Sequence, residues 1–151
     1  MNDFKNKSLW RLTKKVLPQH TDHAGVMWHG SYFNFLEECR VDALEKVGIS
    51  YSDLSKKGFE IPVFSIKIKY KLPFFHGEMV HLISEFNVVN KLRLNCKTLF
   101  VKPNGDIGAE ALIDLVLVYK KNGHMKLARE IPAQVKRIFL LLEEGPKSEN
   151  D

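Results

Sequence analysis

The residues best suited to do chemistry lie in one segment that leads into a predicted helix: Thr21-Asp22-His23-Ala24-Gly25-Val26-Met27-Trp28-His29-Gly30-Ser31-Tyr32. The start of a helix presents unpaired backbone N–H groups and the positive end of the helix dipole to any group that develops negative charge. A carboxylate held beside such donors can attack a carbonyl carbon or activate water against it. Asp22 is therefore the first candidate for a catalytic residue.

Other interpretations of this segment remain open. Thr-Asp ahead of a glycine is also ordinary turn chemistry, in which the carboxylate bonds its own backbone. His20, His23 and His29 suggest a metal site, but no cysteine or clustered carboxylate completes the ligand set, so we expect no metal. The sequence contains no Gly-x-Ser-x-Gly motif, which argues against the nucleophile elbow of the α/β-hydrolases.

A long amphipathic helix is predicted directly after the segment. Apolar residues recur at positions 32, 33, 36, 39, 43, 44 and 47, close to the spacing of a helix with one buried face. Ser31 is the predicted N-cap, and Gly48 is predicted to follow the helix end. Such a helix would hold about 16 residues and measure roughly 24 Å.

The rest of the chain favours strands. A first strand is expected at residues 9–16, and a short helical turn at 52–57. The hydrophobic period then changes to two, which predicts strands at 64–71, 80–86, 92–100 and 109–120. Asn104-Gly105 and Asn122-Gly123 predict tight turns, which imply antiparallel pairing. Ile131-Pro132 opens a last helix with proline in its first turn.

This element order predicts an α+β fold in which a five-stranded antiparallel sheet is wrapped around one long central helix, with a further helix at the C-terminus. One helix covers only part of such a sheet, so the sheet edges and the remaining apolar surface favour dimerisation. We expect one domain over residues 1–151, with a core at about 8–142 and a polar, disordered tail at 145–151.

Composition narrows the function classes. The 151 residues are 44% hydrophobic and 27% charged, as in an ordinary soluble protein, and no apolar run is long enough to span a bilayer. Residues 1–5 carry acid and amide groups where an export signal would be apolar, so we expect a cytoplasmic protein. Cys39 and Cys96 are expected to be free thiols. The net charge of +5 is mild and there are no arginine-rich runs, so no nucleic-acid partner and no membrane partner is predicted.

The segment resembles the hotdog-fold acyl-CoA thioesterases, and more closely the 4-hydroxybenzoyl-CoA thioesterase branch and its bacterial relatives. The resemblance lies in Thr21-Asp22-x-x-Gly25-Val26-x-x-His29-x-x-Tyr32, followed by Tyr32-x-x-Phe35-Leu36-Glu37-x-x-Arg40. It extends over about residues 8–142 and agrees with the predicted element order. His23 departs from the family pattern, in which a small residue or proline is common.

The resemblance implies an acyl-CoA thioesterase that needs no cofactor. Asp22 would attack the thioester carbonyl or activate water, and the backbone N–H of His29 would polarise the carbonyl oxygen. The site would lie at the interface of a homodimer, and many relatives assemble into homotetramers. The acyl group is expected to be short or aromatic, with 4-hydroxybenzoyl-CoA and 1,4-dihydroxy-2-naphthoyl-CoA as examples.

Further site residues are expected around this pair. Gly25, Trp28 and Tyr32 are predicted to contact the substrate, although Tyr32 also fits a core position. Lys67, Lys69 and Lys71 share one face of a strand and could hold the CoA phosphates, as could Lys136 and Arg137.

Three alternatives stay open. Glu37 and Glu38 are reserve candidates for the catalytic acid, with Glu37 also able to pair with Arg40. A non-catalytic module that binds acyl-CoA or an acyl-carrier protein would use the same pocket without needing Asp22. A hotdog dehydratase would need an acid–histidine pair that this motif does not offer.

Overall fold

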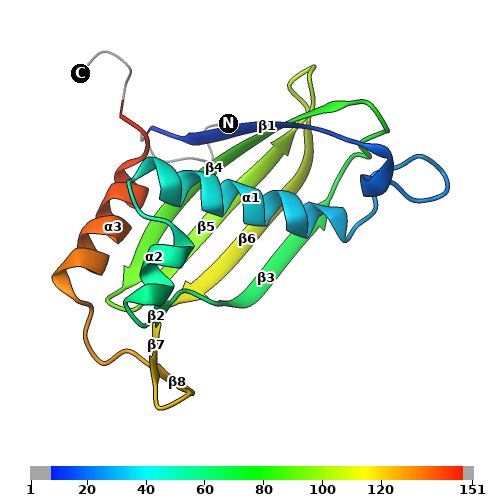
Figure 1. Ribbon diagram of the computed structural model, residues 1–151. Helices are drawn as coiled ribbons and strands as arrows, with labels where there is room; N and C mark the ends of the chain where they lie inside the picture. The colour runs from blue at the N-terminus through cyan, green and yellow to red at the C-terminus, as the bar shows by residue number, and fades with distance from the viewer. Residues whose placement is uncertain (1–7, 148–151) are drawn as a thin grey trace.

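The computed structural model describes residues 8–147, in which one long helix lies across an antiparallel sheet (Figure 1). The elements follow in the order β1 (Trp10–Lys15), a 3-10 turn (Pro18–His20), α1 (Ser31–Lys46), α2 (Tyr51–Lys56), β2 (Phe59–Glu60), β3 (Val63–Tyr70), β4 (Met79–Asn90), β5 (Arg93–Val101), β6 (Ile107–Val116), β7 (Val118–Lys121), β8 (His124–Leu127) and α3 (Ala133–Glu144).

The main sheet has five strands in the order β1-β4-β5-β6-β3, and every neighbouring pair is antiparallel. α1 crosses one face of this sheet, and α3 packs against β4 at the end of the molecule opposite the 21–30 loop (Figure 1). The predicted α+β hotdog architecture, with its central helix and C-terminal helix, is confirmed. In this sheet β3 is an edge strand.

The core forms where the inward residues of the sheet meet the buried stripe of α1. Leu94, Cys96 and Phe100 of β5 point toward the helix, and Phe35 and Ala43 of α1 are fully buried against the sheet. The period-two and 3.6-residue patterns therefore describe two faces of one core. Within it, the buried hydroxyls of Ser84 and Thr98 share a hydrogen bond of 2.7 Å.

Both cysteines are buried free thiols, as predicted. Burial raises the pKa of Cys39 to about 12 and that of Cys96 to about 11. Each thiol is therefore protonated at neutral pH and behaves as a small apolar core residue.

The predicted strand at 109–120 is wrong in one respect, because it is two strands in different sheets. β6 ends at Val116, and β7 joins β2 and β8 in a separate three-stranded sheet. Between them, the Leu117 amide donates to the Leu92 carbonyl and the Leu117 carbonyl accepts from Ala128. The apolar run hides this break because residues on both sides of it are buried.

Sequence periodicity also missed β2 and β8. β2 has only two residues, too few to show a period. All four residues of β8 are exposed, so no alternation marks the strand. The Asn122-Gly123 turn forms between β7 and β8 as predicted.

The ends of the chain are described in part. α3 begins at Ala133, with Pro132 as its N-cap residue, and Trp10 ties β1 to it by donating to the Leu142 carbonyl at 2.9 Å. Residues 148–151 of the predicted tail, and residues 1–5, which bear on export, lie outside the described residues. Over residues 8–147, no helix has both the length and the apolar character needed to cross a membrane.

Candidate active site at the start of α1

Asp22 anchors the loop that precedes α1. Its Oδ1 accepts hydrogen bonds from the amides of Ala24 (2.9 Å) and Val26 (3.3 Å), and its own amide donates to the Val26 carbonyl (2.9 Å). Gly25 closes this turn with a φ of +75°, a conformation that residues with a side chain rarely adopt. The turn interpretation is therefore correct for Oδ1. Oδ2 has no hydrogen-bond partner among residues 8–147, and the side chain is exposed.

The helix start differs from the prediction by one residue. The N-cap is Gly30, without a side-chain bond, and Ser31 is the first helical residue. Ser31 Oγ instead donates to the His20 carbonyl at 2.9 Å, which ties the helix start to the 3-10 turn. Its amide donates to the Trp28 carbonyl. Within the described part of the chain, the amides of His29 and Gly30 have no acceptor.

Asp22 and His29 line a shared pocket. A cavity of about 330 Å³ is lined by Asp22, Val26, Met27, Trp28, His29, Tyr32, Tyr70, Lys71, Leu72 and Pro73. The structure thus brings together four predicted site residues: Asp22, Trp28, His29 and Tyr32. Gly25 shapes the Asp22 turn without lining the cavity.

The other wall of this pocket is the end of β3 and the residues after it, which were not predicted to lie beside Asp22. Tyr70, Lys71, Leu72 and Pro73 come from there. The sequence did indicate which way Tyr70 points. It shares the strand face of Ile66 and Ile68, and this face is turned toward α1. Nothing in the sequence shows that this end of β3 lies beside the Asp22 loop.

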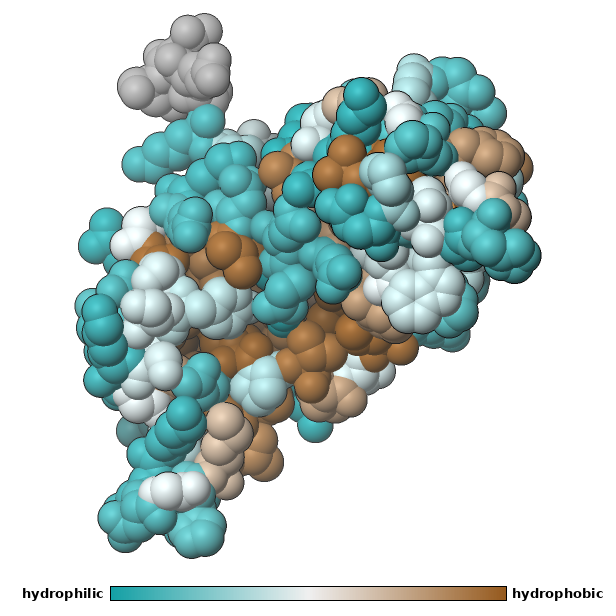
Figure 2. Space-filling view, turned by 45° about the vertical axis from the view of Figure 1, so that its right-hand side comes forward, coloured by the Kyte–Doolittle hydropathy of each residue, from teal (hydrophilic) through white to brown (hydrophobic). Residues whose placement is uncertain are grey.

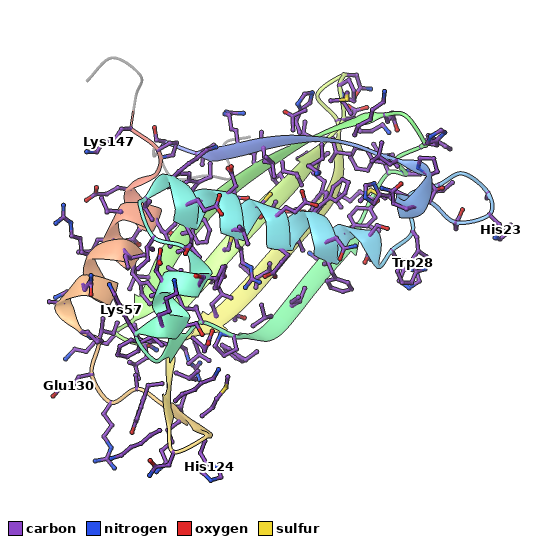
Figure 3. The ribbon with its side chains drawn as sticks, in the orientation of Figure 1. His23, Trp28, Lys57, His124, Glu130 and Lys147 are labelled. Carbon is purple, nitrogen blue, oxygen red and sulfur yellow. The ribbon has the colours of Figure 1, made fainter. Side chains whose placement is uncertain are left out.

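Trp28 folds back over the start of the helix, and Figure 3 shows it there, away from the exposed loop tip that carries His23. Its indole is half exposed and lies 4.8 Å from the His29 ring, centroid to centroid. A Cβ on Gly30 would lie 2.2 Å from Cζ3 of this indole. Position 30 therefore favours glycine because a side chain would collide with the Trp28 ring, and not because the backbone needs an unusual φ.

Tyr32 belongs to an aromatic cluster beneath the pocket. Its ring lies 4.9 Å from Tyr70, 5.0 Å from Phe100 and 6.4 Å from Phe74, and the residue is 3% exposed. Burial, with a smaller contribution from Tyr70, raises its pKa to about 12. Its hydroxyl therefore stays protonated, and the core interpretation holds alongside its place in the pocket wall.

Lys67 and Lys69 lie elsewhere, on the sheet face opposite α1. They line a separate cavity of about 250 Å³ with Lys97 and Glu110. Lys71 connects the two regions, because it lines the Asp22 pocket and forms an ion pair with Glu110. A hydrogen bond from Lys71 outweighs the effect of burial and lowers the pKa of the Glu110 carboxyl.

The remaining candidates fall outside the pocket. Glu37 pairs with Arg40 as predicted, and Glu38 pairs with Lys14 at 2.5 Å. Lys136 and Arg137 belong to α3 and line two other cavities. His20 Nδ1 accepts the Leu17 amide (3.0 Å), while His23 is at the loop tip (Figure 3). Across residues 8–147, no group of three or more His, Cys, Asp or Glu side chains could hold a metal ion.

A family model described as the thioesterase-like superfamily matches residues 16–139. An esterase candidate of Synechocystis is 31% identical over 131 residues, covering 86% of this chain and 78% of that protein. The long-chain acyl-CoA thioesterase FadM of Escherichia coli is 28% identical over 105 residues, covering 69% and 79%.

A similar fold is found among solved structures. A 1,4-dihydroxy-2-naphthoyl-CoA thioesterase from Synechocystis aligns with a TM-score of 0.79 over 88% of this chain and 96% of that one. The identity is 17%, so this likeness concerns the fold alone.

Proposed function

This chain belongs to the thioesterase-like superfamily and is a thioester hydrolase, and from that premise we propose that it hydrolyses an acyl-CoA to the free acid and CoA. The observation that carries the proposal is the shared pocket at the helix start, which is lined by the exposed Asp22 and by His29, whose amide has no acceptor among residues 8–147. A thioester has a good leaving group, so one base or nucleophile and an oxyanion donor suffice.

In the proposed mechanism, the thioester carbonyl oxygen lies against the His29 amide. Asp22 acts through Oδ2, because two amides already occupy Oδ1. As a general base, Oδ2 takes a proton from water, whose oxygen bonds to the carbonyl carbon. The tetrahedral oxyanion then collapses, the C–S bond breaks and the CoA thiolate takes up a proton.

Asp22 could instead act as the nucleophile. Oδ2 would then bond to the carbonyl carbon, expel the thiolate and leave an anhydride that water hydrolyses. A single turnover in heavy-oxygen water distinguishes the two routes, since only the anhydride route carries label into the Asp22 carboxylate.

We propose a short or aromatic acyl group. The rings of Tyr32, Phe74 and Phe100 fill the space beneath the pocket, which supports an acyl group held at the surface beside Trp28. The named relatives act on long-chain acyl-CoA and on 1,4-dihydroxy-2-naphthoyl-CoA, so the test includes both classes together with 4-hydroxybenzoyl-CoA.

For the CoA phosphates we propose Lys67 and Lys69. Their cavity adjoins the Asp22 pocket through the Lys71–Glu110 pair. Lys136 and Arg137 of α3 are the weaker candidates, because α3 lies at the opposite end of the molecule (Figure 1).

We further propose that the working form is a homodimer, or a homotetramer built from it, joined through the β3 edge. β3 is eight residues long and is an edge strand of its sheet. Exposed apolar side chains lie on and beside it, namely Trp28, Phe33, Ile66, Tyr70 and Leu72. Figure 2 shows hydrophobic surface gathered in a band on this side of the molecule. A long apolar edge is an aggregation risk unless it is covered.

The decisive experiment measures thiol release from a panel of acyl-CoAs with wild type and Asp22→Asn. We expect wild type to release thiol from short or aromatic esters, and Asp22→Asn to lose at least about 100-fold in kcat. Asp42→Asn is the matched control, because Asp42 forms an exposed i,i+4 pair with Lys46. Binding of CoA esters without thiol release by wild type would contradict the proposal and favour the non-catalytic binding module.

A further inference from the structure

We infer that Tyr70 is a positioning residue of this site: its hydroxyl holds the His29–Gly30 peptide and thereby keeps the adjacent His29 amide directed at the thioester oxygen. The inference rests on the proposed function, and it concerns a residue outside the loop motif. Tyr70 ends β3, and its hydroxyl donates to the His29 carbonyl at 3.0 Å across 41 residues of sequence.

The Tyr70 ring is held by the aromatic cluster. It meets Tyr32 edge-to-face, with centroids 4.9 Å apart and planes at 85°. Tyr32 is itself buried against Phe100. Edge-to-face packing fixes the direction of the Tyr70 ring, and with it the place of the hydroxyl. Partial burial raises the pKa of Tyr70, so the hydroxyl is protonated and able to donate at neutral pH.

The backbone on either side of this peptide is anchored by other bonds. The Trp28 amide donates to the His20 carbonyl at 2.8 Å, and the Ser31 amide donates to the Trp28 carbonyl at 2.9 Å. The His29 carbonyl is held by the Tyr70 hydroxyl, which donates a hydrogen bond to it. Because Gly30 lacks a Cβ, this peptide would otherwise rotate with little steric cost.

The geometry of a peptide links this bond to the site. The C=O and N–H of one trans peptide lie in one plane and point in opposite directions. Holding the His29 carbonyl therefore fixes the direction of the Gly30 N–H and limits rotation about His29, which lines the pocket. Preorganised donors stabilise an oxyanion without the cost of reorienting during the reaction.

The test compares wild type with Tyr70→Phe, which keeps the ring and removes the hydroxyl. We expect kcat to fall about 5- to 20-fold, because one neutral hydrogen bond to the donor peptide is lost. KM should stay within about twofold, and the shape of the pH profile should not change, because Tyr70 takes no proton. Tyr119→Phe, in the small sheet of β2, β7 and β8, is the matched control and should leave kcat unchanged.

A second readout is independent of turnover. With nitrogen-15 glycine labelling, we expect the Gly30 amide resonance to move and its hydrogen exchange to speed up in Tyr70→Phe, and neither change in Tyr119→Phe. A role in packing alone would lower the midpoint of thermal unfolding without these changes.

The outcomes separate the two proposals. An active wild type with an equally active Tyr70→Phe overturns the inference about Tyr70 alone. A higher KM or a changed pH profile in Tyr70→Phe would mean that Tyr70 contacts the substrate directly. Either result would also overturn the inference that Tyr70 is a positioning residue. No thiol release by wild type overturns the proposed function, and the catalytic role of Tyr70 with it.

Discussion

At the residue scale, the two carboxylate oxygens of Asp22 differ in the contacts that they make. Oδ1 closes a turn by accepting two amides, Oδ2 accepts no hydrogen bond from residues 8–147, and Asp22 lines the pocket. The turn fixes the carboxylate in place before any substrate binds. A structural role of Asp22 in the turn is therefore compatible with its proposed catalytic role. The turn supplies the orientation of the carboxylate that catalysis would require.

The contact of Trp28 with Gly30 gives a prediction at this scale. Gly30→Ala would place a methyl group where the indole lies, and the half-exposed ring can move away. We expect a small change in stability, of about 1 kcal/mol or less, but a red-shifted tryptophan emission and a several-fold higher KM. Steady-state kinetics and fluorescence measure both.

The control for that prediction is the Trp28→Ala background. There the methyl group of Gly30→Ala meets no indole, so the second substitution should leave KM unchanged. A further rise of KM in the double variant would mean that Gly30 is needed for its backbone and not for the ring.

At the element scale, the connection between β3 and β4 holds the Asp22 loop. The Met27 amide donates to the Phe74 carbonyl at 2.8 Å, and the His76 amide donates to the Gly25 carbonyl at 3.0 Å. Lys102 of the β5–β6 turn supports this connection by donating to the Pro73 carbonyl and by lying 4.6 Å from the Phe74 ring centroid.

Glu78 completes that support and gives a pH-dependent prediction. Burial opposes its ionisation, but hydrogen bonds from Lys102 and the Phe75 amide outweigh burial and lower the pKa of Glu78 below its usual 4.5. A lowered folded-state pKa gives stability that is present above pH 4.5 and is lost as pH falls through the folded value.

We therefore expect Glu78→Gln to lower the free energy of unfolding by up to about 1 kcal/mol at pH 7. The difference from wild type should vanish at pH values below the lowered pKa. Urea unfolding at pH 7, 5 and 3 measures it, with Glu45→Gln on the exposed face of α1 as the control. A difference that persists unchanged at the lowest pH would exclude the ionised Lys102–Glu78 contact as its cause.

At the scale of the whole molecule, the pocket lies beside the end of the β3 edge strand. Its walls include the start of α1 and the residues after β3, both beside the exposed apolar side chains described above. A second copy of the chain seated on this edge would close the pocket and cover the apolar surface together.

Charge placed on that edge should separate the subunits. We expect Ile66→Lys, combined with Phe33→Lys, to convert a dimer into monomers and to reduce activity in parallel, because both positions are exposed apolar groups on β3 and α1. Sedimentation velocity with a parallel thiol-release assay measures both effects. Leu127→Lys, on exposed β8, should change neither. A wild type that sediments as a monomer at assay concentrations, yet is fully active, would contradict the proposed homodimer.

The sequence by itself determined the long helix, most of the main-sheet strands and the position of the Asp22 loop before the helix. The long helix and the main-sheet strands were predictable because each buries one face. Apolar residues therefore recur about every 3.6 positions in the helix and every second position in the strands. The motif from Thr21 to Tyr32 likewise placed Asp22 and His29 at a helix start, since their spacing is local.

Only the tertiary structure decided what lies opposite that loop. Tyr70 reaches the His29 carbonyl from 41 residues away because the β3–β6 register and α1 packing bring the end of β3 beside the helix start. The break between β6 and β7 and the N-cap at Gly30 also depend on distant partners, namely the Leu92 and His20 carbonyls. Periodicity records which face is buried, but not which residue lies across from it.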